Sequence, residues 1–407
     1  CSMCMISPKL IEVDKHLNIE IITNARVQGI EGEEGSFRVQ VLKEPRFIDL
    51  GKCSSCGDCT EVCPVTLSNE FEQGLSDRKA VYKRYPQAIP SAMAISKSGT
   101  SPCKIACPAH ISVQGYVALI AQGKYREALN LIREENPFPA VCGRVCTHPC
   151  ESQCSRGKLD EPVSICHLKR FAADKVMETG DYDFPEPAPS TNNKVAVVGS
   201  GPAGLTAAYY LALRGHDVEV FEAMPRPGGM LRYGIPDYRL PPAVLDREIA
   251  AIEAPGVRIK TNCALGRDFT LDSLLQDGFQ AVFLAIGAHK SQRINIEGED
   301  MDDVLPGTDF LRSVAAGEPV RLGRKVAVIG GGNTAIDAAR AAVRLGAEEV
   351  TLVYRRSRAE MPASPWEVME AEDEDIKVYF LAAPERITGE GGKVSGLVCS
   401  KMQLGEP

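Results

Sequence analysis

The sequence has 407 residues, of which 44% are hydrophobic and 25% charged, and its formal net charge is -8. This length exceeds what one hydrophobic core usually supports, so two to four domains are expected. The acidic balance argues against binding to nucleic acid or to anionic membranes, because both favour a basic surface. With no run of about 18 apolar residues and no signal-peptide pattern, we expect a cytoplasmic protein without a membrane span.

Cysteine is unusually frequent, with 15 residues, and all but Cys263 and Cys399 fall at or before Cys166. Disulfide frameworks are typical of small secreted domains, whereas close-spaced cysteines in a large intracellular chain indicate metal binding. We therefore expect a reducing and anaerobic setting. The isolated Cys263 and Cys399 are expected to be small buried hydrophobic residues.

Residues 1–50 begin with Cys1 and Cys4. A single C-x2-C pair fits a redox dithiol, half a zinc site or half an iron-sulfur cluster. For either metal site, the other ligands could lie upstream of Cys1. Two alternating stretches, 19–22 and 37–41, flank the turn-rich residues 31–35. This pattern predicts a β-hairpin with one buried face.

A ferredoxin-type run follows, with the spacing C-x2-C-x2-C-x3-C-P. It consists of Cys53, Cys56, Cys59, Cys63 and Pro64. Thiolates at this spacing each bind one corner of a 4Fe-4S cubane, and the fourth cysteine sometimes serves a different cluster. Structural zinc usually takes two separated cysteine pairs, so the run predicts a 4Fe-4S cluster over zinc.

A second cysteine group indicates further iron-sulfur chemistry. It comprises Cys103, Cys107, Cys142, Cys146, Cys150, Cys154 and Cys166. A spacing of four would place several thiols on one helical stripe, but Gly143 and Pro149 favour a looped segment wrapped around metal. The group suffices for one cluster, or for two with another ligand, and zinc remains the alternative.

Two short helices are predicted between Tyr116 and Glu135, interrupted at Gly123, and residues 180–193 have linker composition. From Lys194 the pattern becomes strand, glycine turn, helix and strand, and it recurs from Lys325. The predicted elements are 194–198, 202–214 and 218–221, then 325–329, 333–345 and 350–354. Two consecutive βαβ units are typical of dinucleotide-binding domains.

The first βαβ unit carries a dinucleotide fingerprint. Its candidate residues are Gly199, Ser200, Gly201, Pro202, Ala203, Gly204 and, at the end of the second strand, Glu222. The three glycines permit a tight turn, close approach of a pyrophosphate and packing of the helix on the strand. The helix N-terminus would stabilise the phosphate, and Glu222 would accept from ribose hydroxyls. A glycine turn without a ligand is the alternative.

The second βαβ unit carries a related turn. Its candidate residues are Gly330, Gly332, Asn333, Thr334 and Ala335. Its second strand is followed by Arg355 and Arg356 where the first unit has an acid. Because arginines bind a 2′-phosphate that a carboxylate would repel, NADP(H) is favoured over NAD(H). The alternative is a solvated basic face.

From about residue 103 the chain resembles the small subunit of NADPH-dependent glutamate synthase and the large subunit of NADH-dependent ferredoxin:NADP oxidoreductase. The resemblance lies in Cys142-Gly143-Arg144-Val145-Cys146, in Cys150-Glu151-x2-Cys154, in Glu161-Pro162-Val163, in the first glycine motif, in residues 227–236 and in Val353-Tyr354-Arg355-Arg356. It implies FAD on the first unit and NAD(P)H on the second. It also adds Gly229, Met230, Arg232, Ile235 and Gly287 to the candidate nucleotide-binding residues.

The N-terminal part, to about residue 90, resembles the interior of the iron-sulfur flavoprotein component of heterodisulfide reductase. The matching stretches are Cys1-x2-Cys4 through Val13, the ferredoxin-type run and Pro86-Gln87-Ala88-Ile89-Pro90. That family places a FAD-binding unit before the first cysteines. The glutamate-synthase-like family has a cysteine pair shortly before the position of Cys103, where this chain has Ile95 and Ser98, and it returns to the FAD domain after the NADPH domain. We therefore expect this sequence to be a piece of a longer polypeptide.

The expected fold is a multidomain α/β protein with α+β parts: a ferredoxin-like Fe-S module, a helical Fe-S domain and two tandem Rossmann-like domains. The predicted boundaries are 1–50 for the remnant of an upstream flavoprotein domain, 51–95 for the ferredoxin-like module, 96–180 for the helical domain, 181–193 for the linker, 194–305 for the FAD-binding domain and 306–407 for an incomplete NAD(P)H-binding domain.

The resemblance implies an NAD(P)H-dependent FAD and iron-sulfur oxidoreductase with two or three 4Fe-4S clusters. Expected partners are other redox proteins of a multi-subunit complex and ferredoxin or a similar carrier, which together could perform flavin-based electron bifurcation. Hydride transfer needs no acid or base from the protein, so no catalytic residue is nominated. The alternatives are a passive electron-transfer scaffold and a reductase like the glutamate synthase small subunit.

Overall fold

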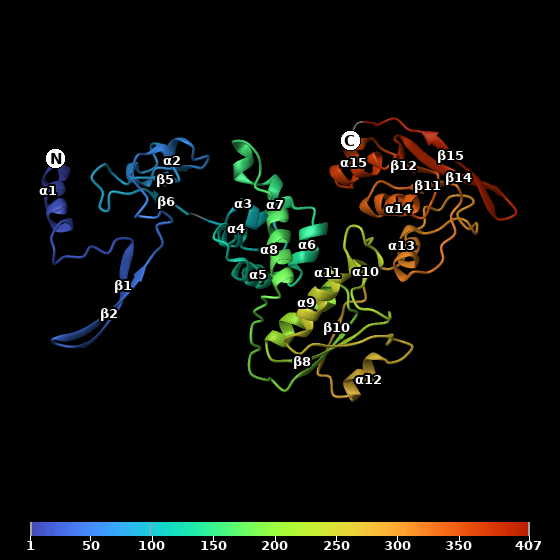
Figure 1. The fold of residues 1–407 in the computed structure, drawn as a ribbon, viewed down its shortest axis with the longest axis horizontal. Coiled ribbons are helices and arrows are strands. Elements are labelled where there is room, and N and C mark those ends of the chain that lie inside the picture. Colours follow the sequence, from blue (N-terminus) through green and yellow to red (C-terminus); the bar gives the residue numbers. More distant parts are fainter. Residues whose placement is uncertain (1, 98, 406–407) are drawn as a thin grey trace. The chain divides into compact units, whose positions relative to one another are not determined.

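The computed structural model describes residues 2–97 and 99–405, without the side chains of Ser2 and Met3. The chain divides into two compact units. The first contains the residues up to Ala106 together with Cys150–Val163, and the second contains Cys107–Pro149 and the residues from Ser164 on. Most helices and several strands of each unit are labelled in Figure 1.

The first unit begins with helix α1 (Ser2–Asp14) and an antiparallel hairpin of β1 (Ala25–Glu33) and β2 (Ser36–Lys43). The expected first strand at 19–22 is wrong, because those residues precede the hairpin without regular structure. The expected buried face is also wrong. Val27, Ile30 and Phe37 have 57%, 64% and 63% of their surfaces exposed.

The cysteine-rich remainder of the first unit is built from very short elements. They are α2 (Asp58–Glu61), β3 (Thr66–Ser68), the 3-10 turn Glu70–Glu72, β4 (Asp77–Lys79), β5 (Val81–Tyr82), β6 (Ala94–Ile95), α3 (Pro102–Ala106) and the 3-10 turn Ser155–Lys158. Strand β3 pairs with β4, and β5 with β6. Helix α7 (Pro149–Ser152) is shared between the units. Its first residue, Pro149, belongs to the second unit, and its other residues belong to the first.

The second unit opens with a helical domain. It contains α4 (Val113–Ala121), α5 (Tyr125–Arg133), α6 (Pro139–Val145) and α8 (Ile165–Thr179). The predicted break at Gly123 is confirmed, with a positive φ of 73° between α4 and α5. Helices α6 and α8 approach closely at Gly143, where an added Cβ would lie 2.7 Å from the Arg170 Cα atom.

The next domain is a four-stranded parallel sheet in the order β10-β7-β8-β9. Its strands are β7 (Lys194–Val198), β8 (Asp217–Phe221), β9 (Arg258–Lys260) and β10 (Ala281–Leu284), and its helices are α9 (Pro202–Leu213), α10 (Met230–Tyr233), α11 (Pro242–Glu253) and α12 (Leu271–Gln276). Phe138 and Val141 of the helical domain share a core cluster with Leu205 and Ile249 of this domain. Side chains of α9 and α11 therefore pack with the residues at the start of α6.

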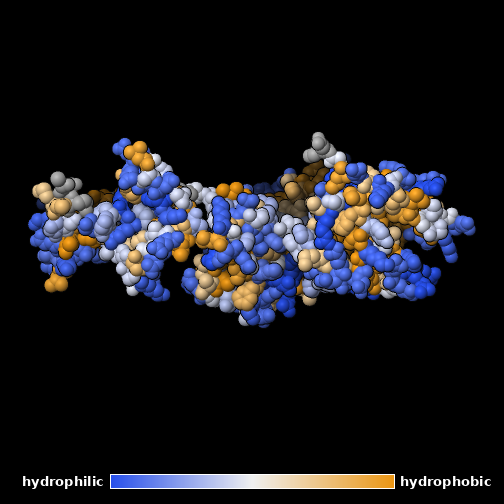
Figure 2. Space-filling model, turned by 90° about the horizontal axis from the view of Figure 1, so that it is seen from above, coloured by the Kyte–Doolittle hydropathy of each residue, from blue (hydrophilic) through white to orange (hydrophobic). Residues whose placement is uncertain are grey.

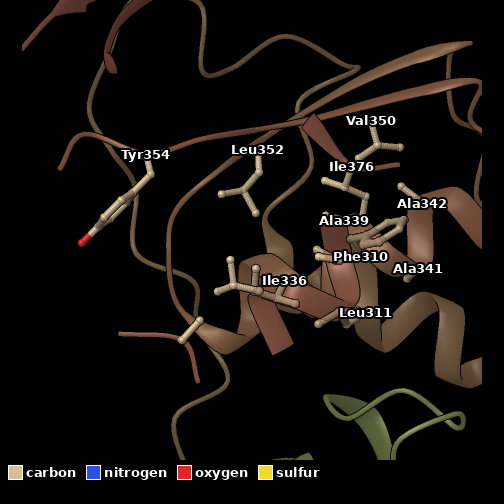
Figure 3. Close-up of a cluster of buried hydrophobic side chains, with 14 residues drawn as sticks. Phe310, Leu311, Ile336, Ala339, Ala341, Ala342, Val350, Leu352, Tyr354 and Ile376 are labelled. Carbon is tan, nitrogen blue, oxygen red and sulfur yellow. The ribbon is translucent and has the colours of Figure 1, made fainter. Parts of the chain in front are cut away.

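A second parallel sheet follows, in the order β11-β12-β13. The domain contains α13 (Gly307–Ala316), β11 (Lys325–Ile329), α14 (Asn333–Arg344), β12 (Glu349–Val353), the 3-10 turn Arg358–Glu360, α15 (Pro365–Asp373), β13 (Lys377–Tyr379) and the antiparallel pair β14 (Ala382–Glu390) and β15 (Lys393–Lys401). Figure 3 shows its core, in which Phe310 and Ile336 lie on the same side of the sheet as Leu352.

The predicted elements of both βαβ units agree with the structure to within one residue. The predicted fold class is confirmed by the two parallel-sheet domains and the matching protein families reported below. No helix in the described part of the chain is long and apolar enough to cross a membrane. The face seen in Figure 2 mixes hydrophilic side chains with separate hydrophobic patches.

Candidate functional site

The first glycine turn connects β7 to α9, and two of its glycines have no room for a side chain. Gly199 has a φ of 104°, and a Cβ there would lie 2.3 Å from the carbonyl oxygen of Ala285. A Cβ on Gly204 would lie 1.9 Å from the carbonyl oxygen of Gly199. These contacts match the roles that the fingerprint assigns to its first and third glycines.

The middle of the same turn is open. A Cβ on Gly201 would meet nothing nearer than the Gly229 Cα atom, at 4.0 Å. Gly229 itself has a φ of 52°, and a Cβ there would lie 2.7 Å from the Gly201 Cα atom. The backbone of residues 228–229 therefore packs closely on the turn, while Gly201 stays partly exposed and the exposed Pro202 and Ala203 begin α9. This is where a pyrophosphate would approach the backbone.

Glu222 is buried and forms hydrogen bonds with the first glycine turn. Its carboxylate accepts hydrogen bonds from the Ser200 backbone N–H at 2.9 Å, the Ser200 hydroxyl at 2.5 Å and the Met224 N–H at 2.7 Å. The Ser200 hydroxyl in turn accepts from the Gly228 N–H at 3.1 Å. The predicted contact with ribose stays a prediction, and the structure adds a positioning role for Glu222.

Arg232 is buried beside this turn. Its Nε donates to the Pro227 carbonyl at 2.5 Å, and a second guanidinium nitrogen pairs with Asp246. The Nη1 atom is buried without a hydrogen-bond partner among the described residues. A buried cationic donor without a partner is costly unless a ligand satisfies it. Met230 and Ile235 flank this arginine, and Gly287 follows β10 with a φ of 70°.

The second glycine turn connects β11 to α14. Gly330 has a φ of 141°, and a Cβ on Gly331 would lie 2.5 Å from the Tyr354 ring. A Cβ on Gly332 would meet nothing nearer than the Pro362 Cγ atom, at 3.9 Å. Its predicted neighbours Asn333, Thr334 and Ala335 form the first turn of α14, as the motif requires.

The arginines after β12 differ in their surroundings. Arg355 and Arg356 are exposed, and within the described residues neither forms an ion pair. Arg358, two residues further on, pairs with Glu372. The two arginines nominated from the sequence are thus available to an anion, while the third is already held by a carboxylate.

The ferredoxin-type run lies in a loop bent by left-handed residues. Ser55 and Gly57 have φ angles of 62° and 98°, and Cys59 lies in α2. The Met93 backbone N–H donates to the Cys53 sulfur at 3.4 Å. Backbone N–H groups aimed at sulfur suit a thiolate cluster ligand.

The backbone also shifts the acidity of this run. Hydrogen bonds from the Met93 and Ser55 backbone lower the pKa of Cys53. Burial raises the pKa of Cys63, but backbone hydrogen bonds around Val81 and Val65 outweigh burial, and the net pKa is lowered. Both cysteines are therefore biased toward the thiolate, the form that binds metal.

The second cysteine group is divided between the two units. Cys103, Cys150 and Cys154 belong to the first unit, and Cys107, Cys142, Cys146 and Cys166 belong to the second. Within residues 2–97 and 99–405, no three His, Cys, Asp or Glu side chains meet the geometry of a metal site. Cys4 is exposed, and Cys1 lies outside the described residues. The ligand assignments therefore stay predictions.

Two cysteines of this group, Cys142 and Cys166, are linked by a hydrogen bond. Burial raises the pKa of Cys142, with Lys169 and Asn136 lowering it only in part. The Cys166 thiol is buried and donates to the carbonyl oxygens of Cys142 and Gly143, each at 3.5 Å. The raised pKa favours the neutral thiol of Cys142 over the thiolate that a cluster needs.

The chain matches two protein-family models. Residues 193–404 match the pyridine nucleotide-disulphide oxidoreductases, and residues 72–181 match dihydropyrimidine dehydrogenase domain II, 4Fe-4S cluster. The chain belongs to the pyridine nucleotide-disulphide oxidoreductase family. Both glycine turns lie in the first match and the second cysteine group lies in the second, so the candidate nucleotide-binding and cluster-binding residues fall in the matched oxidoreductase and 4Fe-4S domains. The ferredoxin-type run lies outside both matched ranges.

Curated relatives of this family member cover about three-quarters of it. The NADPH-Fe(3+) oxidoreductase subunit beta of Geobacter sulfurreducens is 47% identical over 76% of this chain and 47% of its own length. The NADP(+)-dependent formate dehydrogenase subunit beta of Moorella thermoacetica is 46% identical over the same shares. The small chain of glutamate synthase [NADPH] of Escherichia coli K12 is 37% identical over 76% of this chain and 68% of its own. The chain spans about half the length of the first two.

The structure also shows buried charged residues that the sequence analysis missed. Glu248 of α11 accepts the backbone N–H groups of Ala140 and Val141 at the start of α6, both at 2.8 Å. Arg239 pairs with Asp337 and Glu367. The local sequence did not reveal them, because a charged residue next to apolar residues occurs at exposed positions as well as at buried ones.

Proposed function

We propose that this chain receives electrons from NADPH and passes them through FAD to 4Fe-4S clusters, as one part of a multi-subunit oxidoreductase. The observation that carries the proposal is the pair of glycine turns. The first lies beside Arg232, whose Nη1 has no hydrogen-bond partner among the described residues, and the second is followed by the exposed Arg355 and Arg356. When bound, FAD supplies the capacity to take up two electrons together and release them singly.

The residues of the chain divide this work. Gly199, Gly201 and the start of α9 would hold the FAD pyrophosphate, with Arg232 contributing positive charge. Gly330, Gly332 and the start of α14 would hold the NADPH pyrophosphate, and Arg355 and Arg356 would bind its 2′-phosphate. The cysteines of the ferredoxin-type run and of the second cysteine group would bind the clusters.

The test is anaerobic mixing of purified protein with NADPH or NADH. We expect a yellow-brown protein with bound flavin and iron, whose flavin absorbance bleaches faster with NADPH than with NADH at equal concentration. Bound iron without flavin would support the passive scaffold, and zinc without iron would exclude the clusters.

We further propose that the domain boundaries predicted above hold and that residues 1 to about 90 are a heterodisulfide-reductase-like module. The ferredoxin-type run and the exposed apolar face of the β1–β2 hairpin support a module that contacts further protein. In this proposal the partners are other redox subunits and a carrier such as ferredoxin. This module has no place in a glutamate synthase small subunit, which is the alternative function.

A further inference from the structure

Arg239 links the FAD-binding and NADPH-binding domains through a buried ion cluster. It lies in the turn after α10, where its backbone N–H donates to the Pro236 carbonyl at 2.9 Å. Its guanidinium pairs with Asp337 of α14 at 2.6 Å and with Glu367 of α15. The Arg239 side chain is 13% exposed, and each carboxylate side chain is 6% exposed.

Among the described residues, both carboxylates form their ion pairs with this one guanidinium, and Arg340 adds a further electrostatic attraction. Asp337 Oδ1 and Glu367 Oε2 are buried without a hydrogen-bond partner among the described residues. Burial raises the pKa of Asp337 to about 6, although Arg239 lowers it in part. Removing one partner of a buried ion pair leaves an uncompensated charge, which is strongly destabilising for that arrangement. The cluster therefore favours the one domain orientation in which Arg239 reaches both acids.

Both acids are attached closely to the second glycine turn. Asp337 lies one helical turn after Asn333, the first residue of α14. At the start of α15, the Ala363 N–H donates to the Gly331 carbonyl at 3.0 Å and the Ser364 N–H to the Asn333 side chain at 3.3 Å. A displacement of Arg239 would thus move the nucleotide-binding turn itself.

The same end of α15 contacts the helical domain. Trp366 stacks on His148, with ring centroids 4.6 Å apart and planes at 22°. Trp366 is the single tryptophan of the chain. Adjacent residues of α15 therefore contact His148 of the helical domain and Arg239 of the FAD-binding domain.

We propose that Arg239 is a positioning residue for hydride transfer. By pairing with Asp337 and Glu367, it holds the second glycine turn in the orientation that hydride transfer requires. In that transfer NADPH would lose a hydride to become NADP⁺, and oxidised flavin would gain the hydride with its two electrons. The inference rests on the proposed function. Reactions of this kind are sensitive to small misplacements, since a shift of about 1 Å can cost about a hundredfold in rate.

The test is anaerobic stopped-flow reduction of the flavin in the holoprotein. Arg239→Gln should lower the limiting rate at saturating NADPH by about tenfold to a hundredfold, while the half-saturating NADPH concentration changes by less than about threefold. The limiting rate of Arg239→Lys should lie between those of the wild type and Arg239→Gln, because an ammonium group cannot replace a guanidinium that pairs with two carboxylates. Arg258→Gln is the matched control, since Arg258 forms an exposed pair with Asp217 in the same domain.

A second variant separates positioning from folding. Arg239→Gln with Asp337→Asn and Glu367→Gln removes the buried charges together, and it should fold, keep its flavin, be reduced by dithionite and still react slowly with NADPH. Fluorescence of Trp366 should change in both variants as α15 moves from His148. Wild-type limiting rates in both variants, or a change in half-saturation alone, would overturn the inference. A wild type inert to NADPH would remove the proposed function and this inference with it.

Discussion

At the scale of single residues, the two kinds of site differ in how directly the structure supports them. Gly199 and Gly204 are explained by contacts that any side chain would make, as at Gly204, where the nearest backbone atom is 1.9 Å away from an added Cβ. The cysteines are supported by spacing and by backbone hydrogen bonds to sulfur, as at Cys53.

Cys56 tests the ferredoxin-type run. Cys56→Ser should remove about four irons per chain, because a cubane holds four and rarely survives on a poor ligand. Iron and acid-labile sulfide per chain provide the measurement. Cys399→Ser is the control, since burial raises the pKa of that isolated thiol. Unchanged iron in the Cys56 variant would show that the run binds no cluster.

Arg355 and Arg356 test cofactor preference. Each charge-assisted hydrogen bond to the 2′-phosphate contributes about 1.5–3 kcal/mol, so replacing both by alanine should weaken NADPH binding about tenfold or more and spare NADH. Titrations with both nucleotides measure this. Arg358→Ala should leave both affinities unchanged, because that guanidinium is held by Glu372. Equal losses for NADPH and NADH would mean that the pair supports the fold.

At the scale of elements, one buried carboxylate attaches α6 to α11. Glu248 accepts hydrogen bonds from two backbone N–H groups at the start of α6, where a helix has no carbonyl partners of its own to offer. Burial raises its pKa to about 7, while the two backbone hydrogen bonds lower it in part. The helix that contains Cys142 is thereby held against the FAD-binding domain.

Glu248 should give the protein a specific dependence on pH. Because its folded pKa is raised from 4.5, its contribution to stability is fully present below about pH 4.5 and is lost as pH rises through about 7. The unfolding temperature of the wild type relative to Glu248→Gln should therefore fall between pH 5 and pH 8. Glu178→Gln, on the exposed end of α8, is the control. A difference in unfolding temperature between the wild type and Glu248→Gln that does not change with pH would contradict the raised pKa of Glu248.

At the scale of the whole molecule, we expect the intact complex to couple two acceptors. The proposed heterodisulfide-reductase-like module would add a second flavin and further clusters to a reductase that needs only one flavin, which permits a pair of electrons to be divided.

The measurement is stoichiometric. The complete complex is mixed with NADPH, a low-potential ferredoxin and a high-potential acceptor, and each is omitted in turn. We expect ferredoxin reduction only when the second acceptor is present. Ferredoxin reduction that proceeds equally without that acceptor, or never, would indicate a simple series of carriers.

The sequence by itself determined the elements and turns of both nucleotide-binding units. Strand β7 and the start of α14 were located to the residue, because apolar periodicity and glycine requirements are local properties of the chain. The same holds for the cysteine spacing. The predicted hairpin was located only in part, since its alternation reports an apolar face and not whether another element covers that face.

Only the tertiary structure decided which charged residues are buried and what they hold. Glu248 contacts residues more than a hundred positions away, and Arg239 joins two domains that the sequence presents in succession. Nothing local distinguishes these residues from solvated ones, because the cost of burying a charge arises only when distant segments remove it from water and supply its partner.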